Sequence, residues 1–154
     1  MPKITALIHT LNHERVLGRA LESLRPSDEL LIVDHGSTDE TLAIAREYGA
    51  TIQRATTADA VVSEAASNEW LFCLSPLEAL TEHLEASLFE WKLSDPAPHK
   101  SFAVELGEEA SGHWQPLGFA TRLVTRSYPR WREAYPCDDP TAPRLEGMLL
   151  RFRE

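Results

Sequence analysis

The feature that most constrains the fold is a regular alternation of strand-like and helix-like segments along the first 95 residues. Residues 4–8, 30–33, 51–54 and 70–74 read as short strands, and segments with apolar residues at helical spacing lie between most of them. Alternation with short joints predicts a parallel sheet with helices packed on it. The continuous apolar run at 30–33 is typical of a strand that is covered on both faces.

Capping residues predict where the helices begin and end. Asn12 can cap a helix that carries apolar residues from 16 to 24. The runs Ser-Thr-Asp-Glu at 37–40 and Ser-Pro-Leu-Glu at 75–78 both match a capping box, which predicts that a helix starts at each. Gly49 predicts a left-handed end for the second helix.

The remaining segments give weaker patterns. Residues 58–66 predict an alanine-rich helix. Residues 101–106 and 119–125 read as strands separated by a polar loop at 107–113, so the tail leans toward an antiparallel arrangement. Residues 145–152 fit a terminal strand or a short helix, and the pattern does not decide between them.

Composition and charge limit the class of protein. A chain of 154 residues with 43% hydrophobic and 25% charged residues fits one globular domain, 1–154, with an α/β half at 1–95 and a short irregular half at 96–154. A formal charge of −9 argues against nucleic acid as a partner. No apolar run approaches the roughly 20 residues of a membrane span. With no secretory pattern at the N-terminus, we expect a cytoplasmic protein, and a peripheral place at the inner membrane face stays open.

Four motifs, in order along the chain, resemble the family 2 glycosyltransferases of the GT-A fold. The first two are Ile-His-Thr-Leu-Asn-His-Glu at 8–14 and Leu-Glu-Ser-Leu at 21–24. The next two are Val-Asp-His-Gly-Ser-Thr-Asp at 33–39 and Thr-Leu-Ala-Ile-Ala-Arg-Glu-Tyr-Gly at 41–49. Within this family, the chain is similar to the bacterial transferases of the lipopolysaccharide-core type. The resemblance implies a GT-A-like, Rossmann-like three-layer α/β sandwich, with a mainly parallel sheet and antiparallel strands toward the C-terminus.

The resemblance also implies a nucleotide-sugar donor, such as a UDP-sugar, at the carboxyl ends of the strands, where open α/β sheets bind their ligands. The residues expected to bind the nucleotide follow the first two strands: Thr10, Asn12, Glu14, Asp34 and His35. His35 stands where the family has a second acidic residue. For Asp34 a second interpretation is equally open, namely a carboxylate that stabilises the turn.

The metal-binding carboxylates of the family have no counterpart in this sequence. Relatives hold Mg²⁺ or Mn²⁺ with an Asp-x-Asp motif after the fourth strand, and the alignment puts Ser75 and Leu77 at those two positions. Only Glu78 keeps a carboxylate there, and it already has an explanation as the capping partner of Ser75. Hard dications prefer carboxylate and carbonyl oxygens. We therefore predict no metal site and no cofactor.

Other side chains could bind the diphosphate or act as the general base. Ser75, Arg122 and Arg126 are the candidates for the diphosphate, although for Arg122 and Arg126 we favour the simpler interpretation of solvated arginines on an edge strand. Inverting transfer also needs a general base. The weak candidates are carboxylates of the second half, and their spacing singles out none: Asp138, Asp139 and Glu146.

Two functions remain open from the sequence. The first is a glycosyltransferase-like protein whose activity is in doubt because the carboxylates are missing, and the second is a non-catalytic binding or partner module with the same scaffold. Trp114, Trp131 and Tyr135 could form the face of a homodimer or bind a partner protein, or simply pack the tail.

Overall fold

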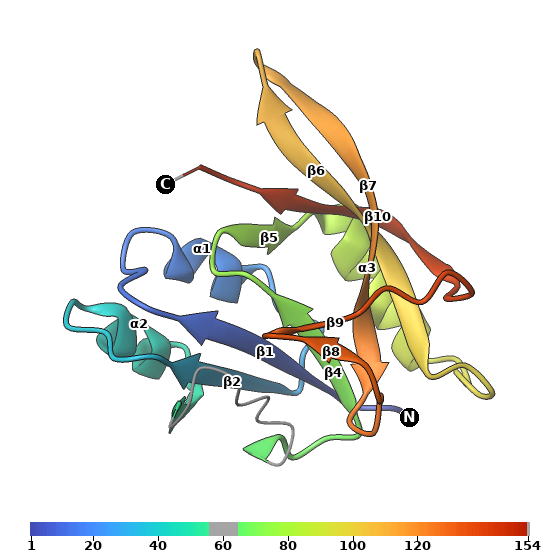
Figure 1. Cartoon of the computed structure of the whole chain (residues 1–154), viewed down its shortest axis with the longest axis horizontal. Coiled ribbons are helices and arrows are strands. Elements are labelled where there is room, and N and C mark those ends of the chain that lie inside the picture. Colours follow the sequence, from blue (N-terminus) through green and yellow to red (C-terminus); the bar gives the residue numbers. More distant parts are fainter. Residues whose placement is uncertain (56–64, 154) are drawn as a thin grey trace.

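The computed structural model describes residues 1–55 and 65–153, and it contains an eight-stranded mixed sheet in the order β3-β2-β1-β4-β7-β6-β10-β5 (Figure 1). The first four strands of this order run parallel, and β7 pairs antiparallel with β4 and with β6. This is the expected α/β class with antiparallel strands toward the C-terminus. The strands of the sheet are β1 (Ile4–Thr10), β2 (Glu29–Asp34), β3 (Thr51–Arg54), β4 (Trp70–Leu74), β5 (Glu78–Leu80), β6 (Ser101–Ala110), β7 (His113–Thr125) and β10 (Arg144–Arg151).

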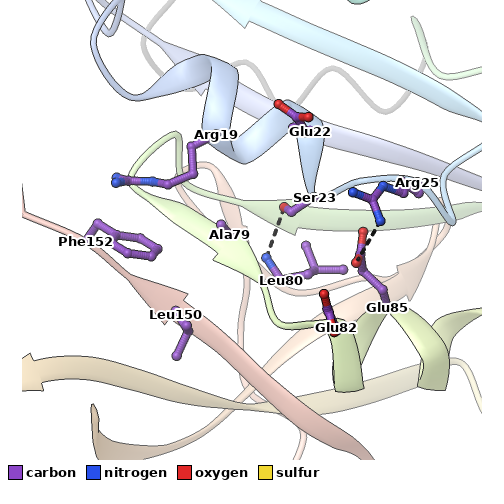
Figure 2. A pocket seen from close by; sticks show the side chains of 10 residues that line it. All are labelled: Arg19, Glu22, Ser23, Arg25, Ala79, Leu80, Glu82, Glu85, Leu150 and Phe152. Carbon is purple, nitrogen blue, oxygen red and sulfur yellow. Dashed lines mark hydrogen bonds and ion pairs between the residues drawn. The ribbon is translucent and has the colours of Figure 1, made fainter. Parts of the chain in front are cut away.

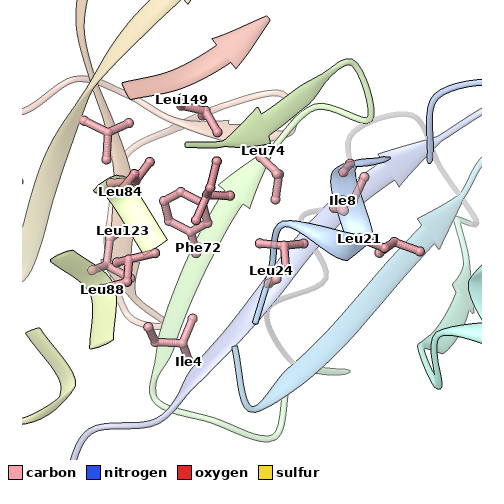
Figure 3. Close-up of a cluster of buried hydrophobic side chains, with 14 of the residues drawn as sticks. Ile4, Ile8, Leu21, Leu24, Phe72, Leu74, Leu84, Leu88, Leu123 and Leu149 are labelled. Carbon is pink, nitrogen blue, oxygen red and sulfur yellow. The ribbon is translucent and has the colours of Figure 1, made fainter. Parts of the chain in front are cut away.

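Three helices pack on one face of the sheet: α1 (Leu17–Glu22), α2 (Thr41–Glu47) and α3 (Glu82–Lys92). Their apolar side chains join alternate residues of the strands, such as Ile8 and Phe72, in one buried cluster (Figure 3). Alternation along a strand sends the intervening residues to the other face. No helix in the described part of the chain is long and apolar enough to cross a membrane.

The opposite face carries a second, smaller cluster. It includes Leu7, Leu31 and Cys73, and the two-stranded sheet of β8 (Trp131–Arg132) and β9 (Tyr135–Pro136) packs beside it. The run 30–33 is therefore covered on both faces, as its apolar character predicts. Cys73 is fully buried, and burial raises the pKa of its thiol to about 12.

The first predicted helix start is wrong. Helix α1 begins at Leu17, and its N-cap is Val16, which makes no side-chain cap. Asn12 has a φ of +57°, and its Oδ1 atom accepts hydrogen bonds from the backbone N–H groups of Thr38 and Asp39. The left-handed backbone turns the Asn12 amide toward the next loop along the sheet, so it caps a neighbouring segment and not its own helix.

The second capping prediction is also wrong in detail. Helix α2 begins at Thr41, and Asp39, not Ser37, accepts the N–H of its first residue. Ser37 instead donates its hydroxyl to Asp34 at 2.6 Å. The oxygen of the Ser37 hydroxyl accepts the N–H of Asn12, so Ser37 joins the two loops and does not cap α2. The predicted left-handed end is confirmed, because Gly49 has a φ of +75°.

Residues 75–78 do not start a helix. The backbone N–H of Glu78 closes a turn on Ser75, and the chain then continues as β5, which pairs with β10. Helix α3 starts at Glu82, where the Thr81 hydroxyl accepts the Leu84 N–H. The local capping signal is present, since the Ser75 N–H does donate to Glu78 at 2.8 Å, but strand pairing over a long sequence distance decides the element.

The last third is more regular than its sequence suggests. The loop predicted at 107–113 is wrong, because β6 and β7 continue through it as a hairpin whose turn lies at Ser111 and Gly112, both with positive φ (Figure 1). Residues 145–152 form most of β10, which settles the open choice in favour of a strand. Of the helix predicted at 58–66, residues 58–64 lie outside the described part of the chain.

Candidate functional site at the carboxyl ends of β1, β2 and β4

Asp34 organises the end of β2. It pairs in register with Thr10 at the end of β1, whose hydroxyl donates to Asp34 Oδ1 at 2.7 Å. The Ser37 hydroxyl also donates to Oδ1, and the backbone N–H groups of Gly36 and Ser37 donate to Oδ2 at 3.1 and 2.8 Å. Burial alone would raise the pKa of Asp34, but the hydrogen bonds from Ser37 and Thr10 outweigh it and hold the pKa below its ordinary value.

These contacts show that Asp34 stabilises its turn, which is one of its two interpretations. An ionised carboxylate has room for about four hydrogen bonds, and Asp34 already accepts that number, three from its turn and one from Thr10. A ligand that contacts Asp34 would therefore have to share or exchange one of them.

The loops that follow β1 and β2 are joined to each other. The Asn12 N–H donates to the Ser37 hydroxyl, the Glu14 N–H donates to Asp39, and the Glu40 N–H donates to Glu14. A hollow of about 340 Å³ opens over this junction, lined by Asn12, Glu14, Arg15 and Asp39. The structure thus brings Thr10, Asn12, Glu14 and Asp34 to one edge, as their strand positions predict.

His35 meets a second histidine at this edge. His9 Nδ1 lies 2.8 Å from His35 Nε2, and the two rings are tilted by 32° with centroids 5.1 Å apart. Burial, reinforced by the neighbouring charge of His35, lowers the pKa of His9 to about 4. His9 is therefore neutral near pH 7, and the hydrogen bond between the rings needs one of them to act as acceptor.

Two arginines share one buried carboxylate at the end of β4. Glu78 has no exposed surface, and Arg122 grips it with two guanidinium nitrogens at 2.8 and 3.0 Å. Arg151 donates to the same carboxylate at 3.1 Å from the facing strand β10, where it is the register partner of Glu78. Arg122 also donates to the carbonyl of Cys73 in β4, which fixes the group against the sheet.

This group does not fit a divalent metal. The Glu78 oxygens accept from the Ser75 N–H and from both arginines, and two guanidinium groups would repel a dication. Among residues 1–55 and 65–153 there is no cluster of three or more histidine, cysteine or acidic side chains that could hold a metal ion. Burial would raise the pKa of Glu78, but the hydrogen bonds and charge of Arg122 hold it below its ordinary value, so Glu78 stays ionised.

The interpretation of Arg122 as a solvated residue on an edge strand is wrong. Strand β7 lies inside the sheet between β4 and β6, and the Arg122 side chain is 7% exposed. The Tyr135 ring lies 4.7 Å from its guanidinium carbon, which adds a cation–π contact. Arg126 lies elsewhere: its N–H donates to Glu69, just before β4 begins, so it lies at the opposite edge of the sheet.

The three weak candidates for a base occupy different places. Asp138 accepts the Thr121 N–H and lines a cavity of about 410 Å³ that also contains Tyr135, the neighbour of Arg122. Asp139 accepts the Ser101 hydroxyl and the groups of its own turn. Glu146 is 85% exposed near the start of β10, beside a different cavity and 3.5 Å from His83.

A further cavity of about 410 Å³ lies between α1, β5 and β10 (Figure 2). Ser23 of α1 accepts the backbone N–H of Leu80 at 3.0 Å, so the helix covers the outer edge of β5. The Arg19 guanidinium stacks on the Phe152 ring at 3.6 Å, and Phe152 in turn donates its N–H to Leu77. The end of β10 is thereby fastened beside the turn that follows β4.

Sequence reasoning missed His9, Tyr135 and Arg151. His9 could have been found from the alternation of side chains along a strand. It pairs in register with Val33, two positions before His35, so His9 and His35 lie on the same face of the sheet. Arg151 could not, because the pairing of β10 with β5 was not foreseen. Tyr135 was considered only as part of an interaction surface.

Comparison with known proteins finds similarity to glycosyltransferases. The profile described as "Glycosyl transferase family 2" matches residues 5–58. The lipopolysaccharide core biosynthesis glycosyltransferase LpsC of Rhizobium meliloti is 46% identical over 50 residues, which are 31% of this chain and 18% of that protein. The uncharacterized glycosyltransferase RT0209 of Rickettsia typhi is 25% identical over 145 residues, which are 83% of this chain and 48% of that protein. The chain thus spans less than half the length of both relatives.

Solved structures share the fold. Glucosyl-3-phosphoglycerate synthase from Mycobacterium tuberculosis, in complex with Mn²⁺, UDP and glucosyl-3-phosphoglycerate, superposes with a TM-score of 0.56 at 18% identity, over 82% of this chain and 58% of that one. S. aureus TarS (1–349) gives 0.54 at 19% identity, over 72% of this chain and 37% of that one. These likenesses show that the chain has a GT-A fold and that its residues 5–58 are similar to the family 2 glycosyltransferases.

Proposed function

We propose that this chain is the nucleotide-sugar-binding part of a glycosyltransferase and that it binds a UDP-sugar at the carboxyl ends of β1, β2 and β4. The observation that carries the proposal is the match to the family profile at 5–58, which covers the ends of β1 and β2 and the loops that follow them. The synthase with the same fold is described with UDP and with UDP-glucose bound. The comparisons do not favour a non-catalytic module, because the named relatives are glycosyltransferases.

In the proposed site, Thr10, Asn12, Glu14, Asp34 and His35 surround the nucleoside, and Ser75 lies toward the diphosphate. Arg122, which the sequence suggested for the diphosphate, is buried against Glu78 and contributes charge without a direct contact. A hydroxyl and a carboxylate at a strand end can pair with the N–H of a base or with ribose hydroxyls. Asp138 is the candidate base that we favour, because its cavity contains Tyr135, which stacks on Arg122. Arg126 is left out, since it lies at the other edge of the sheet.

Calorimetric titration with UDP and with UDP-glucose tests the binding. We expect saturable binding of both ligands, because the nucleoside contacts are common to them. A companion assay follows the release of UDP from UDP-glucose by the wild type and by the Asp138→Asn variant. The rate of release should be about a hundredfold lower in the variant if Asp138 is the base. A complete lack of nucleotide binding would favour the non-catalytic module.

Asp34→Asn identifies the site. The variant keeps the size of the side chain but removes the charge that organises Thr10 and the turn, so UDP affinity should fall about tenfold or more. The matched control is Asp95→Asn, an exposed aspartate that accepts the N–H of Ala97 in a turn of its own. Equal UDP affinity in both variants would remove Asp34 and its neighbours from the site.

A further inference from the structure

The group formed by Glu78, Arg122 and Arg151, here named the Glu78 cluster, carries an excess of positive charge. Two guanidinium groups meet one carboxylate that burial and hydrogen bonding keep ionised. The rest of the chain is strongly acidic, with a formal net charge of −9. The cluster is therefore a local positive site that can attract an anionic ligand to a chain whose overall charge would repel it.

The two arginines of the Glu78 cluster differ in what they can do. Arg122 is 7% exposed, holds the carboxylate with two nitrogens, reaches the Cys73 carbonyl and stacks on Tyr135. The Arg122 guanidinium is therefore occupied by contacts inside the protein and is not available to a ligand. Arg151 has a side chain that is 39% exposed, and within residues 1–55 and 65–153 its guanidinium donates only to Glu78. Most of its N–H donors are therefore directed to solvent.

The position of Arg151 is fixed by more than one contact. Its strand partner is Glu78, and the next residue, Phe152, donates its N–H to the carbonyl of Leu77 in the turn after β4. Arg19 covers the Phe152 ring from α1. A charged group held by backbone pairing loses little further freedom when it binds a ligand.

We propose that Arg151, held in place by Glu78, is the group that contacts the diphosphate of a nucleoside-diphosphate ligand, so that binding needs this arginine and no divalent metal. The inference rests on the proposed function and names the chemistry of its diphosphate end. Guanidinium groups bind phosphate oxygens through charge-assisted hydrogen bonds. Glu78 acts as a positioning residue, and Arg122 balances its charge so that Arg151 keeps a net attraction for the anion.

A simpler explanation is that Arg151 only forms a surface ion pair. Such pairs contribute little to stability and nothing to ligand affinity. The two explanations differ in one measurable property, the dependence of affinity on the phosphates of the ligand. UDP and uridine share the nucleoside and differ only in the diphosphate, so their comparison isolates the contacts with the diphosphate, and the same comparison in an Arg151 variant isolates the share of Arg151.

The experiment is calorimetric titration of the whole chain with UDP and with uridine, in EDTA and in Mn²⁺, for the wild type, Arg151→Gln and Arg153→Gln. Arg153 is an exposed arginine two positions further on and serves as the matched control. We expect Arg151→Gln to weaken UDP binding about tenfold or more while uridine binds as before. Arg153→Gln should match the wild type, and Mn²⁺ should leave the UDP affinity of the wild type unchanged.

Two results would overturn the inference and leave the proposed function intact: equal UDP affinity of Arg151→Gln and the wild type, or a gain of tenfold or more for the wild type in Mn²⁺. If no variant binds UDP or uridine, the proposed function falls, and this inference falls with it. A second measurement needs no variant. Added salt should weaken UDP binding to the wild type more than uridine binding, and equal salt dependence would count against a charged contact.

Discussion

At the scale of single residues, the most constrained group is the Glu78 carboxylate. It has no exposed surface and is surrounded by Arg122, Arg151 and the Ser75 N–H. The sequence explained Glu78 as a helix-capping partner of Ser75. That hydrogen bond exists, but it is one of four, and the others come from strands that lie far away in the chain.

Replacement of Glu78 tests how much the buried ion pair with Arg122 contributes to the free energy of unfolding. Glu78→Gln leaves Arg122 charged and buried with a weakened partner, so the free energy of unfolding should fall by about 3–5 kcal/mol. Urea denaturation measures the change, and Glu90→Gln on the exposed side of α3 is the control. The double variant Glu78→Leu with Arg122→Met should recover part of the loss, because it removes both buried charges. A loss below about 1 kcal/mol for Glu78→Gln would mean that the pair is not desolvated.

At the scale of elements, the contact between β10 and α3 depends on one glycine. Gly147 of β10 has a φ of +97°, and a Cβ atom built there would lie 2.4 Å from the backbone nitrogen of Leu84. The helix can approach the strand only because no side chain stands there. The sequence contains this glycine in the run Leu-Glu-Gly, but nothing local shows that a helix start lies against it.

A pair of glycine variants separates strain from close approach. Gly147→Ala combines an unfavourable φ with a backbone clash and should lower the free energy of unfolding by about 3 kcal/mol or more. Gly112→Ala in the hairpin turn has a φ of +80° but open space around its Cβ, so its loss should be about 1 kcal/mol. Urea denaturation of both variants gives the comparison. Equal losses would show that α3 shifts to make room.

At the scale of the whole molecule, the pH dependence of the free energy of unfolding combines contributions from several partly or fully buried titratable groups. His9 has its pKa lowered to about 4, whereas an unfolded histidine titrates near 6.5. The neutral form is therefore favoured by folding, and this contribution is complete above about pH 6.5 and is lost as the pH falls toward 4. Asp34 and Glu78 also have lowered pKa values, so their contributions are lost in the acid range below the ordinary carboxyl values.

The variant His9→Val isolates the histidine contribution. Valine suits a buried strand position and does not titrate. The wild type should lose more stability than His9→Val between pH 6.5 and 4, and the two curves should run parallel above pH 7. Free energies of unfolding from urea titrations at several pH values provide the curves. Parallel curves over the whole range would show that His9 is protonated as easily in the folded state as in the unfolded one.

The sequence by itself determined the order of the strands along the first half, the faces that they bury and the edge where the polar residues gather. These features depend on apolar periodicity and on the rule that parallel strands end at one edge, and both are local or nearly so. Thr10 and Asp34 could be placed together for this reason. The prediction that Ser75 and Leu77 stand in place of the carboxylates that hold the metal in relatives also came from the sequence alone.

Only the tertiary structure decided where the helices begin, that β5 replaces a predicted helix start, and that Arg151 lies against Glu78. Capping residues such as Asn12 and Ser37 offer hydrogen bonds to any nearby backbone, and which partner they take depends on segments folded beside them. The free energy of one cap is about 1 kcal/mol, which is less than that of a paired strand or a buried ion pair. Where a local signal competes with such long-range pairing, the pairing determines the structure.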